Sequence, residues 1–453
     1  MPILQHTPSR DREAVEAVRR YARPLAEGAC DDADLIALLA GSRYALLGEA
    51  SHGTEDFYRE RAGITKRLIA GHGFAAVAVE ADWPDALRVD RYVRGEPGDA
   101  SAREALADFQ RFPTWMWRNR VVAEFVEWLR EHNAALPAER RCGFYGIDLY
   151  SLFTSMQAVL AYLDRTDLQA ARRARERYAC FDHFHQDSQA YAYAARFGLS
   201  ASCEDEVVTQ LQELVAARGR SAGRDTGVDA TARFQAEQNA RLVRNAEAYY
   251  RTMFSGRVSS WNLRDRHMLE MLEALQDYLA AGRPEPPRLA VWAHNSHLGD
   301  ARATEMGDSG EWNLGQLLRE RHGDAAALLG FSTHHGTVTA ASDWDAPHEK
   351  KRVRPGLEAS YESLFHQIGI ARFRLILRGN DELARALAAP RLQRAIGVIY
   401  RPETERQSHY FLTCLPRQFD AVVHIDQTYA IEPLDRSEPR TEGEAPETYP
   451  SGV

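Results

Sequence analysis

The sequence predicts an α/β protein with a mostly parallel sheet, helices on both faces and a long helical insertion. Short apolar runs with the length of buried strands recur along the chain, and amphipathic helical patterns separate the early ones. A strand, a helix and a second strand in this order favour a parallel sheet. From about Ser151 to Gly282 the helical spacing continues without any strand pattern.

The predicted strands are buried runs rich in aliphatic residues. They are Tyr44–Gly48, Phe74–Val79, Cys142–Ile147, Arg288–Ala293, Ala326–Phe331, Phe373–Leu377, Ala395–Tyr400 and Ala421–Ile425. Between the first two, one helical face carries Phe57, Arg61, Ile64 and Leu68. Gly71 and Gly73 are placed to end that helix.

The same patterns divide the chain into four segments. Residues 1–150 are expected to form the first part of the α/β core, and residues 284–435 the second. Residues 151–283 form the helical insertion, which we expect to act as a lid over the cleft. Residues 436–453 are polar, acidic and proline-containing, which is typical of a disordered tail.

Composition narrows the class of protein. A formal charge of -9 over 453 residues disfavours nucleic-acid binding. No apolar run approaches the ~20 residues that cross a bilayer, and the charged N-terminus does not resemble a signal peptide. The five cysteines are far apart, which favours reduced, separate thiols and no zinc site. These features predict a cytoplasmic protein with no membrane or nucleic-acid partner.

Carboxylates and imidazoles follow four of the predicted strands. They are Glu49, His52, Glu80, Asp82, Asp148, His294 and His297. Ligands bind outside the carboxyl ends of the strands in open parallel sheets. The sequence therefore predicts that four distant segments deliver these side chains to one crevice.

His52 lies in the run G-E-A-S-H-G-T, between a strand and a helix that begins near Thr54. A helix N-terminus disfavours imidazolium, which would keep His52 neutral and able to accept a proton. Glu49 would orient the ring, as the acidic member of a catalytic triad does. Alternatively, Ser51 or Thr54 caps the helix and His52 only fills the turn.

The run V-W-A-H-N-S-H-L-G-D places His294 and His297 on one side of a helical turn. They could polarise a carbonyl, stabilise an oxyanion or bind a metal; alternatively, one is a core histidine. Glu80 could hold a water or a histidine in place, or could pair with Arg61 or Arg88 as part of the scaffold.

Three common catalytic motifs are missing. The sequence has no G-x-S-x-G elbow, no P-loop and no H-E-x-x-H helix. Serine α/β-hydrolases, P-loop nucleotide hydrolases and ordinary zincins are therefore disfavoured.

The chain resembles the erythromycin esterase family, in particular its larger bacterial homologues. The resemblance is carried by G-E-A-S-H-G-T, R-A-G-I-T-K-R-L-I, V-E-A-D-W-P, F-Y-G-I-D-L-Y-S-L and W-A-H-N-S-H-L-G-D, within about Arg43 to Leu434. It implies a three-layer α/β/α core with a helical roof, and hydrolysis of a macrolactone ester without a required metal or cofactor. It also implies His52 as general base, with active-site positions at Glu49, Arg61, Glu80, His294 and His297.

The sequence thus predicts a hydrolase in which His52 activates water against an ester or lactone carbonyl of a small molecule. Arg61, His294 or His297 would stabilise the oxyanion. Two alternatives stay open. One is a metal-dependent peptidase or amidase that uses the Glu and His cluster, and the other is a non-catalytic protein that binds a natural product.

Overall fold

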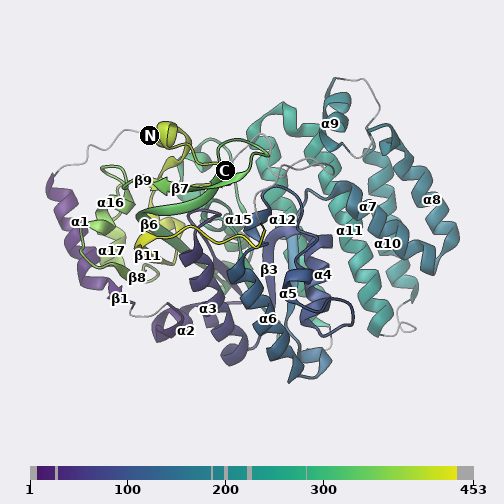
Figure 1. Ribbon diagram of the computed structural model, residues 1–453, viewed down its shortest axis with the longest axis horizontal. Helices are drawn as coiled ribbons and strands as arrows, with labels where there is room; N and C mark the ends of the chain where they lie inside the picture. The colour runs from purple at the N-terminus through teal and green to yellow at the C-terminus, as the bar shows by residue number, and fades with distance from the viewer. Residues whose placement is uncertain are drawn as a thin grey trace.

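The computed structural model describes residues 8–25, 29–184, 187–197, 202–221, 227–281 and 283–435. The predicted tail, residues 436–453, lies outside the described residues. A nine-stranded sheet runs through the middle of the molecule (Figure 1). Its strands are β1 (Arg23–Pro24), β2 (Tyr44–Leu47), β3 (Phe74–Asp82), β4 (Gly143–Asp148), β5 (Arg288–Trp292), β6 (Ala326–Ala341), β7 (His348–Val353), β8 (Arg372–Ile376) and β11 (Ala421–Thr428).

The prediction of a mostly parallel sheet is confirmed. The order is β1-β8-β11-β6-β2-β5-β3-β4, and the six strands from β11 to β4 are parallel to their neighbours. β8 pairs antiparallel with β11, β1 with β8, and β7 with the outer half of β6. The carboxyl ends of β2, β5, β3 and β4 therefore meet along one edge, as the sequence requires for a shared crevice.

The predicted strand at Ala395–Tyr400 is wrong. This segment is extended but makes only isolated bridges, from Ile396 to Ser51 and from Ile399 to Ala341. It packs against the loop after β2, so its apolar residues are buried by loops and not by sheet pairing. The segment lies in sequence between β9 (Arg391–Arg394) and β10 (Tyr410–Thr413), and these two strands pair with each other in a separate two-stranded sheet.

Side chains alternate between two apolar cores, one on each face of the sheet. Tyr44 and Leu46 belong to one core, and Ala45 and Leu47 to the other. The second core is covered by α2 (Ala33–Ala40), α3 (Glu55–His72), α4 (Trp83–Val93), α5 (Ala102–Ala105) and α6 (Arg120–Ala134). The first is covered by α1 (Pro8–Tyr21), α13 (Asn295–Leu298), α15 (Leu314–His322), α16 (Tyr361–His366), α17 (Asp381–Ala386) and α19 (Leu415–Gln418), together with the insertion. This is the predicted three-layer arrangement.

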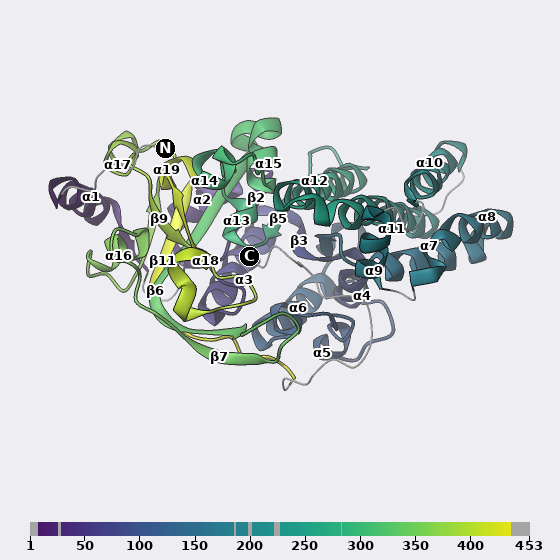
Figure 2. The same cartoon turned by 90° about the horizontal axis from the view of Figure 1, so that it is seen from above.

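Between β4 and β5, the described residues are helical. The helices are α7 (Leu152–Thr166), α8 (Leu168–Tyr178), α9 (Ser188–Arg196), α10 (Glu204–Ser221), α11 (Gly227–Thr252) and α12 (Arg257–Ala280). α7 to α11 extend sideways beyond β3, and α12 returns to the sheet near β5 (Figure 2). α12 packs on β4 and α15, so this one helix brings the insertion to the sheet edge. Among the described residues, no helix is both long and apolar enough to cross a membrane.

The expectation of separate, reduced thiols is wrong for two cysteines. Cys180 and Cys203 form a disulfide between α8 and α10 within the insertion. They are 23 residues apart in the sequence, Cys180 just after α8 and Cys203 just before α10, so their spacing gave no sign that the insertion brings them together. Cys30, Cys142 and Cys414 are free.

Candidate active site

The loop between β2 and α3 holds His52 in a fixed place. Gly48 opens this loop beside Asn295, where an added Cβ would lie only 2.2 Å from the Asn295 amide oxygen. Thr54 is the N-cap residue of α3, but its side chain makes no capping hydrogen bond, and its hydroxyl meets that of Ser51. His52 therefore lies just before the start of α3, where the Thr54 side chain does not cap the helix.

Glu49, His52 and Arg61 form a buried chain of hydrogen bonds. His52 Nδ1 lies 3.0 Å from Glu49 Oε1, and Arg61 Nη2 donates to Glu49 Oε2 at 2.7 Å. A carboxylate oxygen accepts, so Nδ1 of His52 donates this hydrogen bond and Nε2 is the ring nitrogen that Glu49 leaves unoccupied. The Arg61 guanidinium lies over the rings of Tyr58 and Trp292, behind Glu49. Arg61 therefore orders the carboxylate from the side away from the histidine.

His294 follows β5 and lies beside His52, with ring centroids 4.9 Å apart. Its Nδ1 accepts a hydrogen bond from the Ser296 backbone N–H at 3.2 Å, and the Ser296 hydroxyl lies 2.8 Å away. Burial and the adjacent His52 ring lower the pKa of His294 well below its ordinary value. The neutral ring thus has its proton on Nε2, which has no hydrogen-bond partner of normal geometry, although the Ala50 backbone interacts weakly with the ring.

His297 lies one turn later, and its environment is the opposite of that of His294. Its Nδ1 lies 2.9 Å from Asp265 Oδ2, and its Nε2 lies 3.3 Å from Glu80 Oε1. Burial opposes a charge on the ring, but these two carboxylates outweigh it and raise the pKa of His297 to about 9. Trp261 stacks on the ring at 4.5 Å. His297 is therefore an imidazolium at neutral pH, with both N–H groups occupied.

Glu80 connects the two histidine segments. Its Oε2 accepts the His294 backbone N–H at 2.8 Å, and its Oε1 accepts from Arg264 Nη2 at 2.7 Å. Burial would raise its pKa, but His297 and Arg264 hold the pKa well below its ordinary value. The partner considered from the sequence, Arg61 or Arg88, is wrong: Arg61 binds Glu49, and Arg88 binds Asp99 and Asp108.

Arg264 and Asp265 were not identified from the sequence. Both lie on α12 and are buried, and Arg264 also pairs with Asp148 at 2.6 Å. Arg264 Nη1 lies 3.1 Å from His297 Nε2, a contact between two donors that share the Glu80 carboxylate. Their signal in the sequence is the polar run R-D-R-H at residues 264–267, of which Arg264, Asp265 and His267 are buried.

Asp82 and Asp148 belong to the scaffold. Asp82 pairs with Arg111 and accepts the backbone N–H groups of Tyr150 and Ser151. The carboxylate of Asp148 is taken by Arg264 and the Leu149 N–H. These contacts join β3 and β4 to the start of the insertion.

The structure thus brings together all six predicted side chains, in two groups that meet where His52 faces His294. A cavity of about 310 Å³ is lined by Ser296 and Trp261, which contact His294 and His297, and by Tyr410 and Phe411, but its lining contains none of the six side chains themselves. A larger cavity of about 700 Å³ is lined by Phe112 and Trp115, and its lining also contains none of the three histidines.

Among the described residues, the ligand atoms of this cluster do not converge on one point as those of a metal site do. His52 Nδ1 is taken by Glu49, and both ring nitrogens of His297 are taken by carboxylates. Within the described parts of the chain, the one group of His, Cys, Asp and Glu ligand atoms that converges as a metal site does lies elsewhere, at His334, His335 and Asp426. In the described parts of the chain, the Glu and His cluster thus offers no convergent ligand set for the metal-dependent hydrolase considered from the sequence.

Comparisons with known proteins agree with this fold. The model of the erythromycin esterase family matches residues 69–428, which include Glu80, His294 and His297 but begin after His52. A crystal structure described as a succinoglycan biosynthesis protein is 19% identical, with a TM-score of 0.74 over 95% of this chain and 100% of that one. A Bacillus cereus protein is 18% identical, with a TM-score of 0.71 over 93% and 98% of the two chains. A mutant of the erythromycin esterase EreC in its open conformation is 18% identical, with a TM-score of 0.61 over 89% and 95%.

Proposed function

The chain belongs to the erythromycin esterase family, and on this premise we propose that it is a carboxylic-ester hydrolase in which His52 activates a water molecule. The substrate class is a small molecule with an ester or lactone bond, of which macrolactones are one case. The observation that carries the proposal is the pairing of Glu49 with His52 beside the ring of His294, whose Nε2 has no hydrogen-bond partner of normal geometry.

His52 has the features of a general base. Its Nδ1–H is held by Glu49 at 3.0 Å, which fixes the ring and the tautomer. Nε2 would remove a proton from water as the water oxygen attacks the carbonyl carbon. Glu49 would stabilise the imidazolium that forms, and Arg61 would keep Glu49 ionised and in place. The same proton would pass from Nε2 to the leaving alkoxide when the tetrahedral intermediate collapses.

His294 is the group best placed to stabilise the oxyanion. It is neutral, its Nε2–H has no partner of normal geometry, and its ring lies next to that of His52. A donor that is already desolvated and fixed needs no further reorganisation when negative charge develops on the oxygen in the transition state. His297 has no free N–H, so we assign it to a positioning role: with Glu80 it holds the segment that carries His294.

The test uses His52→Gln, with His72→Gln as the matched control. His72 is exposed at the end of α3, so its replacement should leave turnover unchanged. The purified protein is first screened against macrolides, simple lactones and aryl esters by mass spectrometry. For a substrate that is cleaved, His52→Gln should lower kcat/KM by about 10²- to 10⁴-fold without unfolding the protein. Full turnover by His52→Gln would refute the assignment of the base.

A second variant tests the hydrogen bond between Glu49 and His52. Glu49→Gln keeps the shape of the side chain but can present its amide N–H₂ to the ring, which favours the wrong tautomer of His52. We expect kcat to fall by about 10²-fold or more while KM changes little.

If the wild type binds one of these compounds and releases no product, the protein is a binding protein and not a hydrolase.

A further inference from the structure

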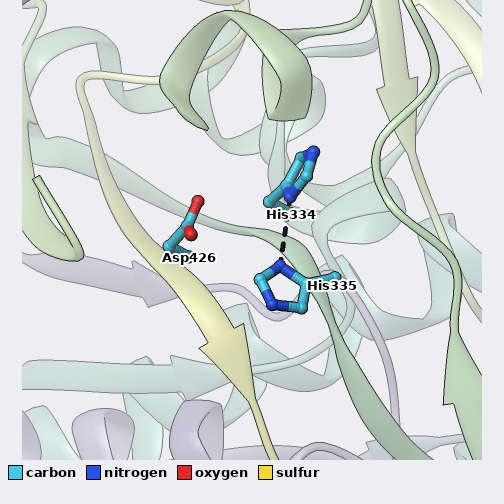
Figure 3. Close-up of side chains that lie close together, drawn as sticks. All are labelled: His334, His335 and Asp426. Carbon is cyan, nitrogen blue, oxygen red and sulfur yellow. Dashed lines mark hydrogen bonds between the residues drawn. The ribbon is translucent and has the colours of Figure 1, made fainter. Parts of the chain in front are cut away.

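A second cluster of histidines lies on strands that do not contribute the catalytic histidines. His334 and His335 are in β6 and Asp426 is in β11, whereas His52 follows β2 and His294 follows β5. We propose that His334, His335 and Asp426 bind a divalent first-row transition-metal ion of the zinc type (Figure 3).

The three side chains converge from two neighbouring parallel strands. One ligand atom from each of the three residues lies within 4.8 Å of the others. The Nδ1 atoms of His334 and His335 face each other at 3.1 Å, although adjacent residues of a regular strand point to opposite faces. Gly336 follows with a φ of 145°, so the backbone leaves regular strand geometry at this point. The break allows both rings to turn to the same side.

The ligand set fits the chemistry of the proposed ion. Imidazole nitrogen and carboxylate oxygen bind Zn²⁺ at about 2.0–2.2 Å, which places ligand atoms of a tetrahedral site roughly 3.3–3.5 Å apart. The 3.1 Å between the two Nδ1 atoms is close to that spacing, so only small ring movements would be needed. Two imidazoles also favour zinc, nickel or copper over magnesium or calcium, which prefer oxygen ligands. The fourth position would be left to water.

A second layer of side chains holds the ligands. His366 Nδ1 lies 2.8 Å from Asp426 Oδ1, and its ring stacks on His334 at 3.9 Å. His424 Nε2 approaches the same Asp426 oxygen at 3.5 Å. Histidines that hydrogen-bond a ligating carboxylate are typical outer partners of metal ligands, because they fix the carboxylate orientation. The cluster is thus built as a site on β6, β11 and the end of α16.

The experiment measures zinc binding to the full chain. After chelator treatment and desalting, the protein is titrated with Zn²⁺ alone by calorimetry, and bound metal is counted by elemental analysis. We expect one Zn²⁺ per chain, with affinity at least 10-fold weaker in His335→Ala and in Asp426→Asn. Asp426→Asn keeps the size of the side chain, so it remains informative if His335→Ala does not fold.

Two further variants locate the ion. His72→Ala removes an exposed histidine, and His52→Gln removes the proposed catalytic base; both should bind one Zn²⁺ with unchanged affinity. Co²⁺ loaded in place of Zn²⁺ should give visible absorption bands typical of four-coordinate geometry, and Asp426→Asn should abolish these bands. No zinc binding by the wild type at millimolar metal, or binding that is lost in His52→Gln and kept in Asp426→Asn, would overturn the proposal.

Discussion

Replacing Asp265 by Asn should lower the pKa of His297 and weaken the fold at neutral pH. Asp265 contacts His297 Nδ1 through both oxygens, at 3.0 and 2.9 Å, and it also accepts the Leu314 N–H at 2.7 Å. Asparagine keeps the size of the side chain and one acceptor oxygen but removes the negative charge. Burial and Arg264 then act against the imidazolium, with only Glu80 left to support it.

The sign and size follow from the two pKa values of His297. The pKa is about 9 in the folded protein, against an ordinary value of 6.5 that applies when the chain is unfolded. The folded protein therefore holds more protons between these pH values, so this contribution is complete below pH 6.5 and is lost as the pH rises to 9. The difference corresponds to roughly 3 kcal/mol of unfolding free energy for a buried group.

The assay is urea denaturation of the wild type and of Asp265→Asn at intervals from pH 6 to pH 9.5. The unfolding free energy of the wild type should fall across this range more steeply than that of the variant, and other titrating groups cancel in the comparison. Proton titration of the histidine rings by NMR should show one ring that stays charged above pH 8 in the wild type alone. Parallel stability curves for the two proteins would refute the assignment of a charged His297.

Two structural predictions concern packing and the disulfide. Gly48→Ala would force a Cβ against the Asn295 amide oxygen and should lower the unfolding free energy in urea by about 1–3 kcal/mol. The control is Gly71→Ala, which should not destabilise the fold because an added Cβ meets nothing within 4 Å there. Equal effects of the two substitutions would contradict the packing argument. Cys203→Ser should lower the unfolding free energy by about 3 kcal/mol, because the disulfide with Cys180 closes a loop of 23 residues. If reductant does not change the thermal unfolding midpoint of the wild type, that result would argue against this bond.

The apolar runs of the sequence determine the central strands. Tyr44–Leu47 and Arg288–Trp292 form β2 and β5 as predicted, because a strand buried on both faces must be apolar at nearly every position. Parallel strands end on the same side of a sheet, so the residues that follow them had to meet. His52 and His294 could therefore be placed together from the sequence alone.

Only the tertiary structure decided which side chains complete the cluster and which of them are charged. Arg264 and Asp265 come from α12, and helical periodicity shows that a helix has a buried face but not where that face docks. His294 and His297 are three residues apart, yet one is neutral and the other is charged, because the pKa of each ring depends on groups from distant segments. The burial of a residue can be inferred from the local sequence, whereas the charge of a buried side chain and the position of its proton are set by contacts with distant segments.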